Sequence, residues 1–189
     1  MSDSLSQQAK ALENQFFHQL DEKLLAQVKE NLAKQPKRDA LSQLTNIKNV
    51  EVLDKLLASG IDAGTFAAMT FVPLAAVAWA DGSIDTAERN AVLKAAENHG
   101  ILPGKPGHLL LEKWLQHPPG PDLLQAWKSY ILELRKVMDP QWISALQKEV
   151  LDQAEQIAEA SGGLLGLVQT VSPAEKRKLA ELAKTFAGG

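Results

Sequence analysis

The chain has 189 residues, of which 45% are hydrophobic, and it carries a net charge of −3. The apolar content is ordinary for a globular protein, and the acidic balance argues against binding nucleic acid mainly through electrostatics. The absence of cysteine excludes disulfides, thiolate metal ligands and cysteine nucleophiles. The N-terminal residues lack the basic region and apolar region of a signal peptide, so we expect a cytoplasmic protein.

The first predicted element is a helix from Leu5 to Lys34, which the spacing of its apolar residues indicates. Its apolar stripe continues through Phe17, Leu20, Leu24, Val28 and Leu32. We expect the helix to end at Gln35-Pro36, because the residue before a proline avoids the helical conformation. An isolated helix could not bury this stripe. Residues 1–60 are therefore predicted to form a helical extension that packs on the rest of the chain or on a second copy of it.

Residues 63–80 contain no charged side chain and approach the ~20 apolar residues that a membrane span needs. Polar residues and Pro73 interrupt this run, however, and its C-terminal flank is acidic without a basic anchor. Helices that are apolar on all sides are typical of protein cores. We therefore predict a buried central helix with a kink at Pro73, and no integral membrane span.

The remaining elements follow from helical periodicity and from the residues that start and stop helices. The predicted helices cover residues 40–44, 50–59, 86–99, 109–116, 122–138, 140–160 and 173–187. No segment shows the sustained alternation of a β strand. The sequence therefore predicts an all-α protein of about nine helices. We expect a helical bundle of about six helices at 61–189, preceded by the extension at 1–60.

Residues 81–88 place three carboxylates and one glycine directly after the apolar run. The usual roles of residues at the start and end of a helix explain most of these four residues. Gly82 is suited to the left-handed conformation that closes a helix. Asp85 is a good N-cap, and Glu88, three residues further on, completes a capping box. Residues 84–88 also align with residues 171–175, where Ser172, Pro173 and Glu175 repeat the same device.

Helix capping explains Asp81 least well, because a negative charge is unfavourable at the C-terminal end of a helix. A cation held by Asp81, Asp85 and Glu88 would remove this penalty and the repulsion between the carboxylates. All three ligands are hard oxygens, which favours Ca²⁺ or Mg²⁺ over Zn²⁺. The alternative is a solvated Asp81 that makes an Asx turn or pairs with Arg89.

The run from Ala78 to Glu88, followed by Ser172 to Lys176 at the start of another helix, resembles the tellurite-resistance TerB-like family. That family is all-helical, and its Ala-Asp-Gly…Glu signature carries acidic residues that are thought to bind divalent metal. The resemblance covers about residues 64–187. It implies a TerB-like helical domain that binds a divalent cation, with a role in a stress response.

The second half of the signature departs from the first, because Val168 and Gln169 stand where the first half has Asp81 and Gly82. This departure argues against a metal site that takes ligands from both halves of the signature. A complete EF-hand calcium loop is excluded as well. Such a loop would need oxygen ligands at two further positions, and Val77 and Trp79 occupy them.

Two functions remain open from the sequence. The first is a divalent-metal-binding module that uses Asp81, Asp85 and Glu88. The alternative is a metal-free scaffold that binds an unknown protein partner, or a second copy through the N-terminal helix. We expect no enzymatic activity, because no catalytic motif joins the histidines, which are His18, His99, His108 and His117. The acidic net charge leads us to expect no nucleic-acid partner.

Overall fold

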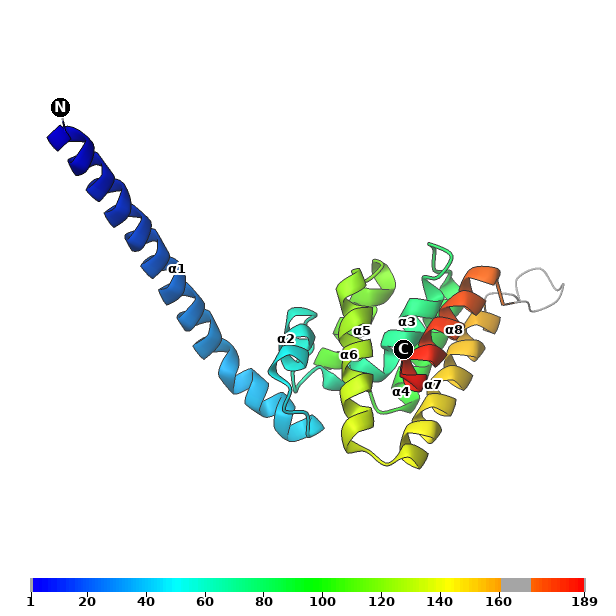
Figure 1. Ribbon diagram of the computed structural model, residues 1–189. Coiled ribbons are helices and arrows are strands. Elements are labelled where there is room, and N and C mark those ends of the chain that lie inside the picture. The colour runs from blue at the N-terminus through cyan, green and yellow to red at the C-terminus, as the bar shows by residue number, and fades with distance from the viewer. Residues whose placement is uncertain (1, 161–170, 189) are drawn as a thin grey trace.

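The computed structural model describes the backbone of residues 2–160 and 171–188, and the side chains of residues 22–159 and 171–188. The described backbone is helical and contains no β strand, which confirms the all-α class. Its elements are α1 (Ser2–Thr45), α2 (Val50–Ala58), the 3₁₀ helix η1 (Phe66–Phe71), α3 (Val72–Ala78), α4 (Thr86–Asn98), α5 (Pro106–Gln116), α6 (Pro121–Val137), α7 (Pro140–Ala160) and α8 (Pro173–Ala187). Figure 1 shows α1 projecting from a body that the other helices form.

The predicted end of the first helix at Gln35-Pro36 is wrong, because α1 continues through Pro36 to Thr45 and includes the predicted helix at 40–44. Side-chain hydrogen bonds bridge the turn that the proline weakens. Gln35 Nε2 donates to Asp39 Oδ1 at 2.8 Å, and Arg38 Nη2 donates to Asn31 Oδ1 at 3.2 Å. These contacts help to offset the backbone hydrogen bond that a proline inside a helix removes.

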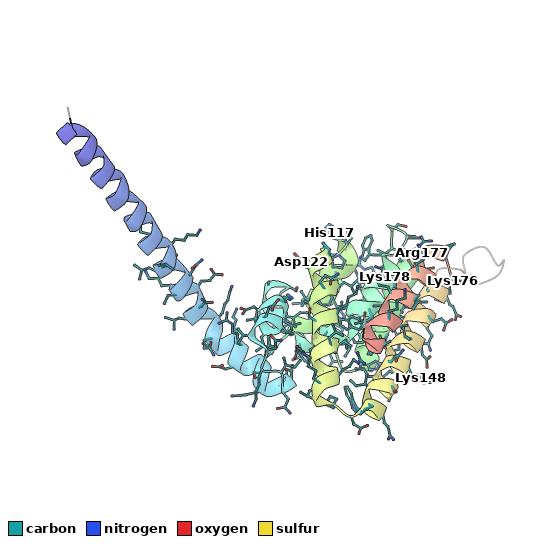
Figure 2. All side chains as sticks on the ribbon, viewed as in Figure 1. His117, Asp122, Lys148, Lys176, Arg177 and Lys178 are labelled. Carbon is teal, nitrogen blue, oxygen red and sulfur yellow. The ribbon has the colours of Figure 1, made fainter. Side chains whose placement is uncertain are left out.

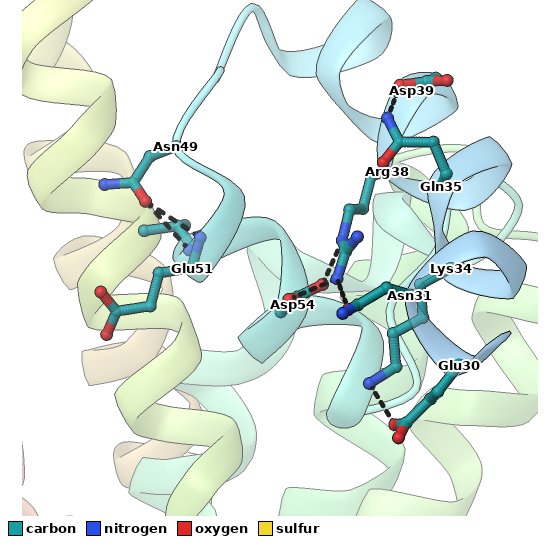
Figure 3. A network of polar contacts seen from close by, with 10 residues as sticks. Glu30, Asn31, Lys34, Gln35, Arg38, Asp39, Asn49, Glu51 and Asp54 are labelled. Atoms are coloured by element: carbon teal, nitrogen blue, oxygen red, sulfur yellow. Dashed lines mark hydrogen bonds and ion pairs between the residues drawn. The ribbon is translucent and has the colours of Figure 1, made fainter. Parts of the chain in front are cut away.

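An ion pair joins the C-terminal part of α1 to α2 (Figure 3). The buried Arg38 donates through Nε to Asp54 Oδ1 at 2.5 Å and through Nη2 to Asp54 Oδ2 at 2.7 Å. The hydrogen bond from Arg38 lowers the pKa of Asp54 below its ordinary value. Two parallel bonds between a guanidinium and a carboxylate fix direction as well as distance. This pair therefore sets the direction in which α1 leaves the body.

The centre of the body is α3, whose residues from Val72 to Ala78 are buried except Ala76. It contacts α6, α7 and α8, as well as its neighbours η1 and α4, which confirms the predicted buried central helix. The predicted continuous helix with a kink at Pro73 is wrong. Pro73 instead lies in the first turn of α3 after η1, where a proline loses no intrahelical hydrogen bond.

No described helix combines the length and the apolar character needed to cross a membrane. The core of the body draws on residues from both sides of position 60. Leu41 and Leu56 are fully buried in the same cluster as Leu74 and Leu111. The end of α1 and α2 thus contribute to this core, and the boundary at residue 60 stays a prediction.

Candidate functional site

The joint between α3 and α4 is closed by a local turn. The exposed carboxylate of Asp81 accepts hydrogen bonds from the Ser83 N–H at 3.0 Å and from the Ser83 hydroxyl at 3.2 Å. This is the Asx turn that the sequence left open as an alternative. Gly82 has the predicted left-handed conformation, with a positive φ of 94°. It does not close the helix as predicted, because α3 ends at Ala78 with Trp79 as its C-cap and Gly82 lies in the turn that follows.

The next residues form the predicted capping box at the start of α4. The Glu88 N–H donates to Asp85 Oδ1 at 2.8 Å, and the Asp85 N–H donates to Glu88 Oε2 at 2.8 Å. Both side chains therefore satisfy backbone donors that the first turn of a helix leaves without partners. Asp85 is exposed, whereas Glu88 is buried.

The second joint repeats this arrangement at the start of α8. The Ser172 N–H donates to Glu175 Oε2 at 2.6 Å, and the Glu175 N–H donates to Ser172 Oγ at 3.2 Å. Pro173 occupies the first turn, as predicted. The match between residues 84–88 and 171–175 is therefore a match of structure as well as of sequence. The positions of Val168 and Gln169 lie outside the described residues.

The two capping-box glutamates are buried to nearly the same extent, with Glu88 5% exposed and Glu175 4% exposed. Burial raises the pKa of Glu88 from 4.5 to about 7, although the hydrogen bond from the Asp85 N–H opposes this change. Part of this rise comes from the negative charges of Asp85, Glu175 and Asp81. Glu175 therefore lies within electrostatic range of Glu88, so the two joints share one acidic region.

The structure does not gather the predicted ligands into a metal-holding group. Among the residues whose side chains are described, no three acidic or histidine side chains converge as metal ligands would. The oxygens of Asp81, Asp85 and Glu88 instead accept the turn and cap hydrogen bonds. Binding of Ca²⁺ or Mg²⁺ at this joint stays a prediction.

His108, which was not predicted as a functional residue, lies in the first turn of α5 and is 4% exposed. Its ring nitrogens make no hydrogen bond to the described residues. They lie 3.9 Å from Glu97 Oε1 and 3.7 Å from Glu112 Oε2. His108 and Glu112 are four residues apart, so they lie on the same face of a helix. The sequence did not indicate this contact, because the predicted helix began at Leu109, after His108.

The body also has an open depression of about 590 Å³ between the end of α2, α5 and the start of α6. Lys55, Lys113, His117 and Asp122 are among its lining residues, and Figure 2 shows His117 and Asp122 near one another at the α5–α6 connection. His117 is the C-cap of α5, whose last residue is Gln116, the predicted end of this helix.

The basic triplet of Lys176, Arg177 and Lys178 lies along α8 (Figure 2). Lys176 and Arg177 are exposed, and Lys178 is half-buried and donates to Glu181 Oε2 at 2.7 Å. Glu181 also accepts a bond from Lys128 of α6 at 2.5 Å. The link between α8 and α6 is therefore the pair of Glu181 with Lys128, and Lys178 bonds to the same carboxylate from within α8.

A run of exposed apolar side chains lies on α1. Every described side chain from Glu22 to Ala33 is exposed, so this part of the helix does not pack on the body. Its large apolar residues are Leu24 at 50% exposure, Leu25 at 60%, Val28 at 54% and Leu32 at 67%. We call these four residues the α1 stripe. The side chains of Phe17 and Leu20, which continue the predicted stripe, lie outside the described side chains.

Comparison with known proteins gives no relative, because no protein-family model, curated protein or solved structure matches the chain. The resemblance to the TerB-like family therefore stays an expectation from the sequence.

Proposed function

We propose that this protein is a non-catalytic helical interaction module whose contact surface is the α1 stripe. The observation that carries the proposal is the exposure of four large apolar side chains, each at least half exposed, on a helix that projects from the body. Contiguous apolar surface of this kind is typical of a protein–protein contact. A helix gains most of its stability from packing an apolar face, and a bound partner would supply that packing.

The anchoring of α1 supports the same function. The Arg38–Asp54 pair and the burial of Leu41 fix the C-terminal part of α1 on the body. The α1 stripe lies more than one turn before this anchor, and its residues are held away from the core. A contact surface on a rigid element that is fixed at one end loses less conformational freedom on binding than a disordered segment would.

A pair of variants tests this function. In the dilute monomer, Leu24→Gln with Val28→Gln should leave the melting temperature unchanged, because both side chains are exposed. Leu41→Ala is the control and should cost about 2–5 kcal/mol, the usual range for a buried leucine. A loss of monomer stability in the double variant similar to that of Leu41→Ala would place the stripe in the chain's own core and defeat the proposal.

Photo-crosslinking supplies the functional readout. A photoreactive residue at position 28 should form adducts with other protein chains. The same residue at Ala33, which is exposed on the opposite side of the helix, should not. Equal adducts from the two positions, or none from position 28, would contradict a specific contact surface.

A second candidate function is the binding of a divalent cation at the joint between α3 and α4, by Asp81, Asp85 and Glu88. The observation that favours it is the concentration of negative charge around the buried Glu88, to which Asp85, Glu175 and Asp81 contribute. A cation would relieve this repulsion, and oxygen ligands suit Ca²⁺ or Mg²⁺. This function would agree with the resemblance to the TerB-like family and with a role in a stress response. Titration calorimetry of the full chain with each ion tests it, and no heat of binding at millimolar ion would contradict it.

A further inference from the structure

We propose that the buried His108 is a pH-sensitive latch, which ties α5 to α4 when its ring is protonated. The latch belongs to the body and does not depend on the α1 stripe. The observation that carries it is a ring whose two nitrogens face carboxylates on two different helices. Neither nitrogen has a hydrogen-bond partner among the described residues.

The ring of His108 lies between the last turn of α4 and the first turn of α5. Its Nε2 is 3.9 Å from Glu97 Oε1 of α4, and its Nδ1 is 3.7 Å from Glu112 Oε2 of α5. Both distances exceed the length of a hydrogen bond, which is about 2.7–3.2 Å. The nitrogens are closed off from solvent, whereas the glutamate side chains are 46% and 35% exposed. The ring is therefore fixed in the body, and the carboxylates are the parts that can move toward it.

The number of N–H donors on the ring decides whether the latch closes. A neutral imidazole has one donor and one acceptor nitrogen, whereas a protonated imidazole has two donors. An ionised carboxylate only accepts. A neutral His108 therefore satisfies at most one of the two glutamates and turns a lone pair toward the other. The protonated ring donates to both, after a movement of about 1 Å at each carboxylate.

The surroundings of the ring favour both of its charge states through opposing effects. Burial penalises the charged ring, and a cation is unfavourable in the first turn of a helix. Two carboxylates favour the charged ring. One of them, Glu97, lies in the last turn of α4, which contains no basic residue and where an uncompensated negative charge is unfavourable. Protonation of His108 compensates this charge and gives both buried nitrogens a partner.

The other charged groups around this contact belong to different interactions. The 3₁₀ helix η1, which packs on α5, has no titratable side chain. Asp62, in the loop before η1, accepts hydrogen bonds from backbone N–H groups of its own loop. The cations next to the contact along the chain, Lys94 and Lys105, are exposed. The two glutamates are therefore the groups that respond to the ring.

Amide hydrogen exchange in the full-length chain tests the latch. Protection factors, which correct for the intrinsic pH dependence of exchange, should rise about tenfold at residues 99–112 between about pH 8 and pH 5, where imidazole gains its charge. This rise should exceed that of α2, which lies outside the contact. Glu97→Gln and Glu112→Gln should each reduce the excess, because an amide attracts an imidazolium less strongly than a carboxylate does. A wild type without the excess would overturn the proposal.

Two further variants assign the effect to one histidine. His108→Phe keeps a ring and removes both nitrogens, so no buried nitrogen is left without a partner. This variant should remain folded and lose the excess. The matched control is Glu149→Gln, because Glu149 lies 3.5 Å from the ring of His99, the C-cap of α4. It should keep the excess, and loss of the excess in Glu149→Gln but not in His108→Phe would overturn the proposal.

NMR of the imidazole nitrogens supplies a readout that does not require His108→Phe to fold. Long-range ¹H–¹⁵N spectra of the wild type distinguish a neutral ring from a ring protonated on both nitrogens. His108 should carry two ring protons in the acidic state, in which residues 99–112 are more protected, and one in the other. A ring that keeps one protonation state between about pH 8 and pH 5, or that changes it without a change in protection, would overturn the latch.

Discussion

Glu88 and Glu175 are equivalent residues of two capping boxes, both are buried, and the negative charge of Glu175 raises the pKa of Glu88. Each carboxylate caps its own helix by accepting a backbone N–H within three residues. Glu175 affects the pKa of Glu88 because the packing of the body brings their two helices together; α7 contacts both α4 and α8. The two joints are therefore locally independent but electrostatically linked, and this link gives the first predictions.

The stability of the protein should depend on the protonation of Glu88. Its folded-state pKa of about 7 lies above the ordinary value of 4.5, so between these values the folded state binds more protons than the unfolded state. The free energy of unfolding should therefore fall as pH rises from about 4.5 to about 7, by about 2 kcal/mol after allowance for solvent screening. Urea unfolding of the wild type and Glu88→Gln at pH 5, 6, 7 and 8 measures this. The same slope in both proteins would show that Glu88 is not the titrating group.

Glu175→Gln should lower the pKa of Glu88, because it removes one of the charges that raise it. Glutamine keeps an oxygen that can accept the Ser172 N–H, so the cap of α8 should survive. The Glu88 carboxyl pKa can be followed by NMR titration of its ¹³C resonance. The control is Glu155→Gln, a change at an exposed residue of α7. An unchanged pKa in Glu175→Gln would mean that the two joints are not in electrostatic contact.

The cap of α8 should act on stability alone. Ser172→Ala removes the hydroxyl that accepts the Glu175 N–H and should cost about 1 kcal/mol, the usual loss for an N-cap. Ser172→Thr keeps a hydroxyl acceptor and should cost less. Chemical denaturation of the three proteins checks this order. Loss of cation binding in Ser172→Ala would instead assign the second joint to a metal site.

Asp81→Asn discriminates between the metal site and the local turn. Asparagine keeps a side-chain oxygen for the Ser83 bonds, so the metal-free protein should remain folded. If the joint binds a cation, metal at 100 times its dissociation constant should stabilise the wild type by about 2.7 kcal/mol, and the variant should lose this gain. Thermal melts with and without millimolar Ca²⁺ or Mg²⁺ measure it. Equal wild-type melting temperatures in both conditions would reject cation binding.

Arg38→Ala should destabilise the protein, because it leaves the carboxylate of Asp54 without its two bonds and removes the bridge to Asn31 across Pro36. Arg38→Lys should recover only part of the loss, since an ammonium cannot make two parallel bonds. The matched control is Lys148→Ala, which breaks the exposed Lys148–Asp152 pair at 3.0 Å and should have little effect. Similar melting temperatures for Arg38→Ala and Lys148→Ala would contradict an anchoring role for Arg38.

Several features of the fold could be predicted from the sequence because they depend on neighbouring residues. The capping boxes at Asp85 and Ser172 use atoms three residues apart, so their sequence pattern indicates their geometry. The left-handed Gly82 is local in the same way. The all-α class and the buried central helix follow from apolar periodicity over single segments.

Other features were decided by contacts between distant parts of the chain. Pro36 should end a helix locally, but α1 continues past it where the pair of Arg38 with Asp54 of α2 holds the following turn. Burial and the charge of Glu175, 87 positions away in the sequence, raise the pKa of Glu88.

The same distinction applies to the α1 stripe and the acidic joint. Periodicity predicted the stripe, but only the tertiary structure showed that Leu24 and Val28 are not covered by the body. The three carboxylates of residues 81–88 were visible in the sequence, but it could not decide which hydrogen bonds they would accept. Coulomb interactions and burial depend on distance in space, which a sequence determines only through the complete packing of its helices.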